Sequence, residues 1–168
     1  HYARRLAGGT VPLRGGVRRL LQEAAAAGLP QGIVTTSARA AVQALCDAVL
    51  GADLAAVFSF WVCGEDVQRK KPDPEAYRLG AAQLGLPGRR ILAIEDSPLG
   101  LRAAVAAGLP CLVTLEPGRL PGAPDSSAAR AVVDGLGDGE RPVRVFRGPP
   151  CPAGQVTLSW LQCLLDEA

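Results

Sequence analysis

The chain has 168 residues, of which 48% are hydrophobic and 20% are charged. This length matches one ordinary domain, and the composition supports a buried core, which excludes an intrinsically disordered chain. The formal net charge of +2 is too balanced for a nucleic-acid-binding protein that depends on counterion release, and no apolar run is long enough for a transmembrane helix.

The first half of the chain alternates helical and strand patterns. Helical spacing begins at Val17 and ends before Gly28, and a short apolar run follows at residues 32–35. Residues 39–49 return to a helical pattern. The aromatic and β-branched residues of 56–63 suit a strand or the edge of an apolar loop.

The second half continues this alternation. We expect a helix over 74–84 with proline in its first turn, then an uninterrupted apolar strand at 91–94. The next helix ends before Gly108, and a strand follows at 111–113. The remaining expectations are a short strand at 131–133, a surface excursion over 135–154 and a closing amphipathic helix over 156–165.

Continuous apolar strands separated by helices of about ten to twelve residues indicate a parallel sheet that helices cover on both faces. The predicted fold class is therefore α/β, with a doubly wound sheet. No internal repeat and no second domain is evident in the sequence.

Cysteine and histidine usage narrows the chemistry. The five cysteines include no Cys-x-x-Cys pair, which indicates unpaired thiols in a reducing compartment. We therefore expect a cytoplasmic protein, with the plastid stroma as the alternative. The only histidine is His1, which argues against histidine metal sites and Ser-His-Asp triads.

Hydroxyl groups follow the first predicted strand, in the run Val34-Thr35-Thr36-Ser37. In an open parallel sheet, ligands bind beyond the carboxyl ends of the strands, and the start of the next helix attracts anions. Thr35, Thr36 and Ser37 are thus candidate phosphate-binding residues. The alternative is ordinary capping of the helix that follows.

Two adjacent carboxylates, Glu95 and Asp96, follow the apolar strand at 91–94. Hard carboxylate oxygens suit Mg²⁺, which takes one or two carboxylates together with phosphate and water. The alternative is that Asp96 caps a helix that has Pro98 in its first turn. That alternative leaves Glu95 unexplained.

The only lysines of the chain stand in the run Lys70-Lys71-Pro72-Asp73-Pro74. A proline restricts the backbone of the residue before it, so Lys71 could be directed at a phosphate as a point charge. A solvated lysine pair ahead of a helix is the alternative. The order of hydroxyl strand end, Lys-Pro and acidic strand end favours a shared phosphate and metal site.

These three motifs resemble those of the haloacid dehalogenase (HAD) superfamily, in the branch of β-phosphoglucomutase-like and CbbY-like enzymes. Thr35 with its neighbours resembles the second motif, Lys71-Pro72-Asp73-Pro74 the third, and Ile94-Glu95-Asp96-Ser97 the fourth. Arg39, residues 64–67 and residues 135–138 look most like the CbbY-type branch, whose members act on xylulose 1,5-bisphosphate.

The resemblance implies catalytic roles for Thr35, Lys71 and Asp96 and a Mg²⁺ cofactor on Glu95 and Asp96. It implies that Ser97 braces the loop between them and the next helix. The implied substrate-binding residues are Thr35, Thr36, Ser37, Arg39 and Lys71. In the family a carboxylate nucleophile attacks phosphorus, and water cleaves the resulting aspartyl-phosphate.

The chain departs from the family at its first motif, Asp-x-Asp-Gly-Thr, which supplies the nucleophile. No Asp-x-Asp occurs here, and the chain contains no methionine. We therefore expect a piece of a longer protein, with a HAD-type Rossmann-like sheet that lacks its first, central strand and most of the helical cap. Residues 1–10 are expected to be a remnant of the last cap helix, and residues 11–168 an incomplete core domain.

The predicted function of the full-length protein is a Mg²⁺-dependent phosphatase of a small phosphorylated sugar, xylulose 1,5-bisphosphate being one candidate. The chain by itself is expected to be inactive. The alternatives are a phosphomutase of the β-phosphoglucomutase type and a catalytically dead HAD-like domain that binds a ligand or partner protein. No nucleic acid or membrane partner is expected, and the oligomeric state is left open.

Overall fold

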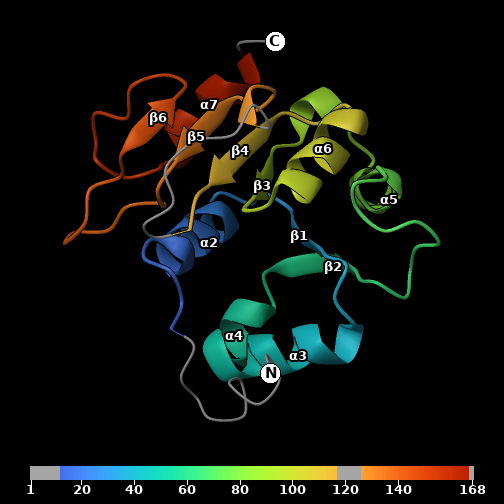
Figure 1. Cartoon of the computed structure of the whole chain (residues 1–168). Helices are drawn as coiled ribbons and strands as arrows, with labels where there is room; N and C mark the ends of the chain where they lie inside the picture. Colours follow the sequence, from blue (N-terminus) through green and yellow to red (C-terminus); the bar gives the residue numbers. More distant parts are fainter. Residues whose placement is uncertain (1–11, 117–125, 167–168) are drawn as a thin grey trace.

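A four-stranded sheet of order β3-β4-β5-β6 forms the centre of the computed structural model, which describes residues 12–116 and 126–166 (Figure 1). Strands β3 (Ala93–Glu95), β4 (Cys111–Thr114) and β5 (Ala131–Val133) are parallel. Strand β6 (Val145–Arg147) pairs antiparallel with β5.

Helices cover both faces of this sheet, because its strands are apolar on both sides. Residues Cys111 and Val113 of β4 pack with helix α6 (Pro98–Ala106) and with Tyr77 of helix α5 (Glu75–Leu84). Leu112, between them, packs on the opposite face with helices α2 (Val17–Ala26) and α7 (Leu158–Asp166). The layering confirms the predicted α/β class with helices on both faces.

A second, two-stranded parallel sheet consists of β1 (Gln31–Val34) and β2 (Phe58–Val62). Helix α3 (Arg39–Val49) packs on it through Val42 and Cys46, and the short helix α4 (Ala52–Ala55) follows α3. Helix α5, which follows β2 in the chain, also packs against both strands. Within the described ranges, β1 pairs only with β2 and β3 pairs only with β4, so both strands keep one edge without a strand partner.

Three details differ from the sequence-based expectations. Strand β3 begins at Ala93 rather than at residue 91, because a 3-10 turn over Gly88–Arg90 holds the preceding residues. Helix α4 was not predicted. The segment 135–154 was expected to be an irregular surface excursion, but it contains strand β6. This strand forms in spite of its glycine- and proline-rich flanks because it pairs with β5.

The predicted cap remnant at residues 1–10 lies outside the described residues. Among the helices that the structure does describe, none is long and apolar enough to cross a membrane.

Candidate active site

A cavity of about 370 Å³ opens where the carboxyl ends of β1, β3 and β4 meet. Both sheets contribute to its wall, because their strands end on the same side. The lining residues are Arg14, Val34, Thr35, Thr36, Lys71, Ile94, Glu95, Asp96, Ser97 and Thr114. The structure thus brings together residues of all three sequence motifs, as expected for ligand binding at the strand ends.

Lys71 is held between the two sheets. Its Nζ atom donates to the carbonyl oxygen of Val34, at the end of β1, over 2.9 Å and to Oε1 of Glu95, at the end of β3, over 2.5 Å. The side chain is only 10% exposed. The alternative of a solvated lysine is therefore wrong, and the ammonium group is a fixed positive charge in the wall of the cavity.

Glu95 is a buried carboxylate whose partners neutralise and orient it. Besides Lys71, the hydroxyl group of Tyr77 donates to Oε1, and the Ser97 hydroxyl group lies 3.4 Å from Oε2. The carboxylate rests directly against the start of α6, where a Cβ atom at Gly100 would collide with it. A buried charge needs such pairing to offset the loss of hydration.

Tyr77 was not identified from the sequence. Burial, followed by the negative charge of Glu95, raises the pKa of its phenol well above the ordinary value, so the hydroxyl group remains a neutral donor. Its ring also faces Lys71, whose Nζ atom lies 4.6 Å from the ring centroid. Only its position in the sequence could have indicated Tyr77, because it lies in the first turn of the helix that follows the Lys71 loop.

Asp96 lies at the mouth of the cavity with an exposed side chain. The N-cap of α6 is Ser97, whose Oγ accepts from the backbone N–H of Gly100 over 3.0 Å. The capping alternative for Asp96 is therefore wrong. Its carboxylate is not used to start the helix, and the residue is one of those that line the cavity.

Thr35 and Thr36 line the cavity, whereas Ser37 and Arg39 do not. The capping alternative is wrong for the hydroxyl groups too: the N-cap of α3 is Ala38, which makes no side-chain bond there, and the N–H of Arg39 donates to Glu65 instead. Thr35 Oγ1 accepts from the N–H of Ser37 over 3.1 Å, which fixes the tight turn after β1.

The guanidinium group of Arg39 is engaged on the outside of the molecule. It donates to Asp66 Oδ2 over 2.6 Å and to the carbonyl oxygen of Trp61 over 3.3 Å. Its side chain is 49% exposed. In this structure Arg39 is therefore a surface ion-pair partner, and its predicted contact with substrate remains a prediction.

Arg14 is a second cation that the sequence did not indicate. Its guanidinium group donates to Thr114 Oγ1 over 3.2 Å and to the carbonyl oxygens of Leu115 over 2.5 Å and Asp134 over 3.3 Å. Arg14 therefore connects the carboxyl ends of β4 and β5 beside the cavity. The pairing joins residues 100 positions apart in the chain, and no local pattern indicates it.

The donor set fits Mg²⁺ in its chemistry. Glu95 and Asp96 place carboxylate oxygens on one cavity that also holds Lys71 and two threonine hydroxyl groups. Mg²⁺ takes one or two carboxylates and completes its octahedron with phosphate and water. In residues 12–116 and 126–166, no group of three or more His, Cys, Asp or Glu side chains gathers as a complete metal site.

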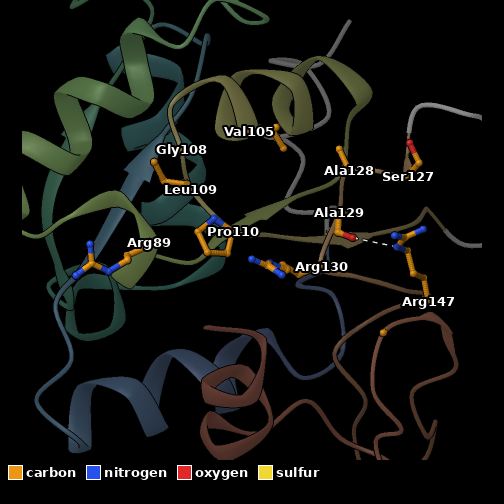
Figure 2. Close-up of a pocket in the computed structure, with 11 residues that line it drawn as sticks. Arg89, Val105, Gly108, Leu109, Pro110, Ser127, Ala128, Ala129, Arg130 and Arg147 are labelled. Carbon is orange, nitrogen blue, oxygen red and sulfur yellow. Dashed lines mark hydrogen bonds between the residues drawn. The ribbon is translucent and has the colours of Figure 1, made fainter. Parts of the chain in front are cut away.

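A larger cavity of about 650 Å³ lies at the other end of the strands of the four-stranded sheet, before the starts of β4 and β5. It contains none of the motif residues. Figure 2 shows Arg89, Arg130 and Arg147 spread along it rather than directed at one point. Arg147 donates to the carbonyl oxygen of Ala129 over 3.1 Å, and the adjacent carboxyl end of α6 favours cations. Local structure thus accounts for this basic character.

Comparison with known proteins shows which proteins the chain is related to. The sequence model of a family described as haloacid dehalogenase-like hydrolase matches residues 1–108. Protein CbbY encoded on a plasmid of Cupriavidus necator is 43% identical over 143 residues, which cover 85% of this chain and 56% of that protein. Phosphoglycolate phosphatase of Escherichia coli is 40% identical over 85 residues, covering 51% of this chain and 32% of the enzyme.

Solved structures of CbbY proteins are similar to this chain as well. The crystal structure of CbbY from Rhodobacter sphaeroides in complex with phosphate superposes with a TM-score of 0.72 at 36% identity, over 79% of this chain and 58% of that one. A mutant of the same protein in complex with xylulose 1,5-bisphosphate gives 0.71 at 34% identity, over 80% and 60%. The chain spans about half the length of the curated relatives it matches.

Proposed function

The chain belongs to the haloacid dehalogenase-like hydrolase family, and from that premise we propose that the full-length protein is a Mg²⁺-dependent phosphatase of a small phosphorylated sugar. One observation carries the proposal: the cavity at the strand ends joins Thr35 and Thr36, the buried Lys71–Glu95 pair and the exposed Asp96. These are the groups that recognise a phosphoryl group and its counterion.

The residues of this chain have separable roles. Thr35 and the backbone N–H of Thr36 donate hydrogen bonds to phosphoryl oxygens, and the ammonium group of Lys71 neutralises their charge. Glu95 and Asp96 would hold Mg²⁺. When bound, the metal stabilises negative charge on the transferring group, a contribution that is often the largest in phosphoryl transfer.

The nucleophile belongs, in our proposal, to a part of the full-length protein outside residues 1–168, which adds a strand between β1 and β3. The apolar residue Ile94 of β3 is 44% exposed, and β1 and β3 each have one edge without a strand partner within the described parts of the chain. A carboxylate at the end of such a strand would lie beside Lys71. Its aspartyl-phosphate would then be hydrolysed by water.

Xylulose 1,5-bisphosphate is the first substrate to test, because a relative of 34% identity was crystallised with it. Bacterial and plant relatives are compatible with action in the cytoplasm or the plastid stroma. The compartment stays a prediction.

The test is a screen of the full-length protein on sugar mono- and bisphosphates, with Mg²⁺ and with EDTA. We expect phosphate release that needs Mg²⁺ and that falls by at least about a hundredfold in Lys71→Met and Asp96→Asn, since each removes a charge that acts on the transferring group. The matched control is Lys70→Met, which removes the exposed neighbouring charge. Phosphate release that is equal in all of these variants would refute the proposal, and no release on any phosphate ester would favour a ligand-binding domain without activity.

A further inference from the structure

We propose that Tyr77 is a positioning residue of this site, and that its hydroxyl group fixes Glu95 and Lys71 relative to each other. The expected effect of Tyr77 on catalysis rests on the proposed function. The structural basis of the inference is independent of that function.

The hydroxyl group of Tyr77 lies within the charged pair. It donates to Oε1 of Glu95, the same oxygen that accepts from Lys71, and it lies 3.5 Å from the Lys71 Nζ atom. The ammonium group of Lys71 also lies over the face of the Tyr77 ring, with its Nζ atom 4.6 Å from the ring centroid. Tyr77 therefore restrains both the carboxylate and the ammonium group with one side chain.

Packing alone does not require this hydroxyl group. Tyr77 is 7% exposed and belongs to the apolar cluster of α6 and β4, where a phenylalanine ring would fill the same space. Burying a hydroxyl group costs free energy unless a hydrogen bond compensates for it. Here the compensating bond goes to Glu95, so the polar atom serves the site rather than the core.

The loop that carries Lys71 is tied to the start of α5 by hydrogen bonds from residues on both sides of Lys71. The carboxylate of Glu75 accepts from the backbone N–H groups of Gln68 and Arg69 over 2.9 and 3.0 Å. Asp73 Oδ1 accepts from the N–H of Glu75 over 3.0 Å. Glu75 is the first residue of α5, and Tyr77 lies in the same turn, so these bonds fix the position of the Lys71 loop relative to Tyr77.

Tyr77 is not one of the residues that line the cavity, so we expect it to act on the site indirectly. Its effect would pass through Glu95. Hydrogen bonds to a metal-ligating side chain orient it, and their loss typically lowers metal affinity about 10- to 100-fold. Removing the hydroxyl group should therefore weaken Mg²⁺ binding and slow turnover, while the affinity for the phosphorylated substrate changes little.

The experiment uses the full-length protein and the variant Tyr77→Phe, which keeps the ring and its contact with Lys71. The control is Leu79→Ala, a change on the same helix at a 39% exposed residue. Three measurements are made. Titration calorimetry without substrate gives the Mg²⁺ affinity, thermal melting in EDTA gives the stability, and steady-state kinetics at saturating Mg²⁺ give kcat and KM. For Tyr77→Phe we expect a dissociation constant for Mg²⁺ raised about tenfold or more, a lower kcat, and a KM within about twofold of wild type.

Equal Mg²⁺ affinity in Tyr77→Phe and wild type overturns the proposal, and a lowered melting temperature in EDTA with unchanged affinity assigns Tyr77 a structural role only. If wild type releases no phosphate but binds Mg²⁺, and Tyr77→Phe weakens that binding, the proposed phosphatase function fails while the positioning of Glu95 stands. If wild type is active and the variant matches it in Mg²⁺ affinity and kcat, only the role of Tyr77 is refuted.

Discussion

Glu95 organises the site at the scale of single residues. Its carboxylate is 8% exposed, and a charge this buried is stable only with partners. Lys71, Tyr77 and Ser97 supply them from three separate positions in the chain. The requirement to neutralise one carboxylate therefore brings the lysine motif to the acidic motif.

Gly100 leaves the space that Glu95 occupies, and we expect Gly100→Ala to be destabilising. An added Cβ atom would collide with the carboxylate, so the full-length protein should lose about 1–3 kcal/mol in its free energy of unfolding. Gly139→Ala is the matched control, because a Cβ atom there meets nothing within 4 Å, and its effect should stay within about 0.5 kcal/mol. Urea denaturation measures both, and equal stability of the two variants would contradict the assigned contact.

At the scale of elements, Arg19 joins helix α2 to the segment that follows β5 and to the segment that precedes α7. Its guanidinium group donates to the carbonyl oxygens of Leu136, Gly137 and Val156 over 3.2, 3.4 and 3.0 Å, and it forms an ion pair with Glu23 over 2.9 Å. A planar fork with several donors suits such a cluster of acceptors. This contact holds the buried Leu136 and Gly137, after β5, against α2, whereas residues 139–142 are exposed.

We expect Arg19→Lys to destabilise the full-length protein by about 1–3 kcal/mol, because an ammonium group cannot satisfy the same set of carbonyl oxygens. Arg18→Lys is the control on the same helix. Arg18 is exposed and makes one bond, to the carbonyl oxygen of Val49, so its replacement should change stability by less than about 0.5 kcal/mol. Midpoints of urea denaturation compare the two, and a smaller loss for Arg19→Lys than for Arg18→Lys would refute the role of the fork.

At the scale of the whole molecule, the two sheets are connected through side chains, and no strand of one pairs with a strand of the other in the part of the chain that the structure describes. Lys71 joins the ends of β1 and β3, and α5 packs on the two-stranded sheet while also contacting α6. The exposed Ile94 lies on the edge strand β3. Exposed apolar strand edges favour association with another strand.

We therefore expect the 168-residue chain alone to have no phosphatase activity and a broad thermal transition, whereas the full-length protein melts cooperatively and is active. In our proposal, the carboxylate that accepts the phosphoryl group belongs to a strand outside these 168 residues. Calorimetry and phosphate release on the two proteins test this. Turnover by the 168-residue chain that Asp96→Asn abolishes, or a sharp monomeric transition of that chain, would contradict the expectation.

Local sequence determined most of the elements and the site motifs. Helical and strand periodicity depends on neighbouring residues, so α2, α3, α5 and α6 appear where they were predicted. The positions of Thr35, Lys71, Glu95 and Asp96 at or near strand ends follow from the same patterns, because parallel strands end on one edge. Strand β6 was missed since its pairing with β5 depends on a partner distant in sequence.

Tertiary structure alone decided which groups face one another. It assigned the cap of α6 to Ser97 and left Asp96 at the cavity, paired Arg39 with Asp66, and added Tyr77 and Arg14 to the surroundings of the site. The physical reason is that a side chain's partner is set by packing between distant segments, and by the need to satisfy each buried charge. The sequence by itself determined the chemistry available at the strand ends, and the packed molecule determined how that chemistry is arranged.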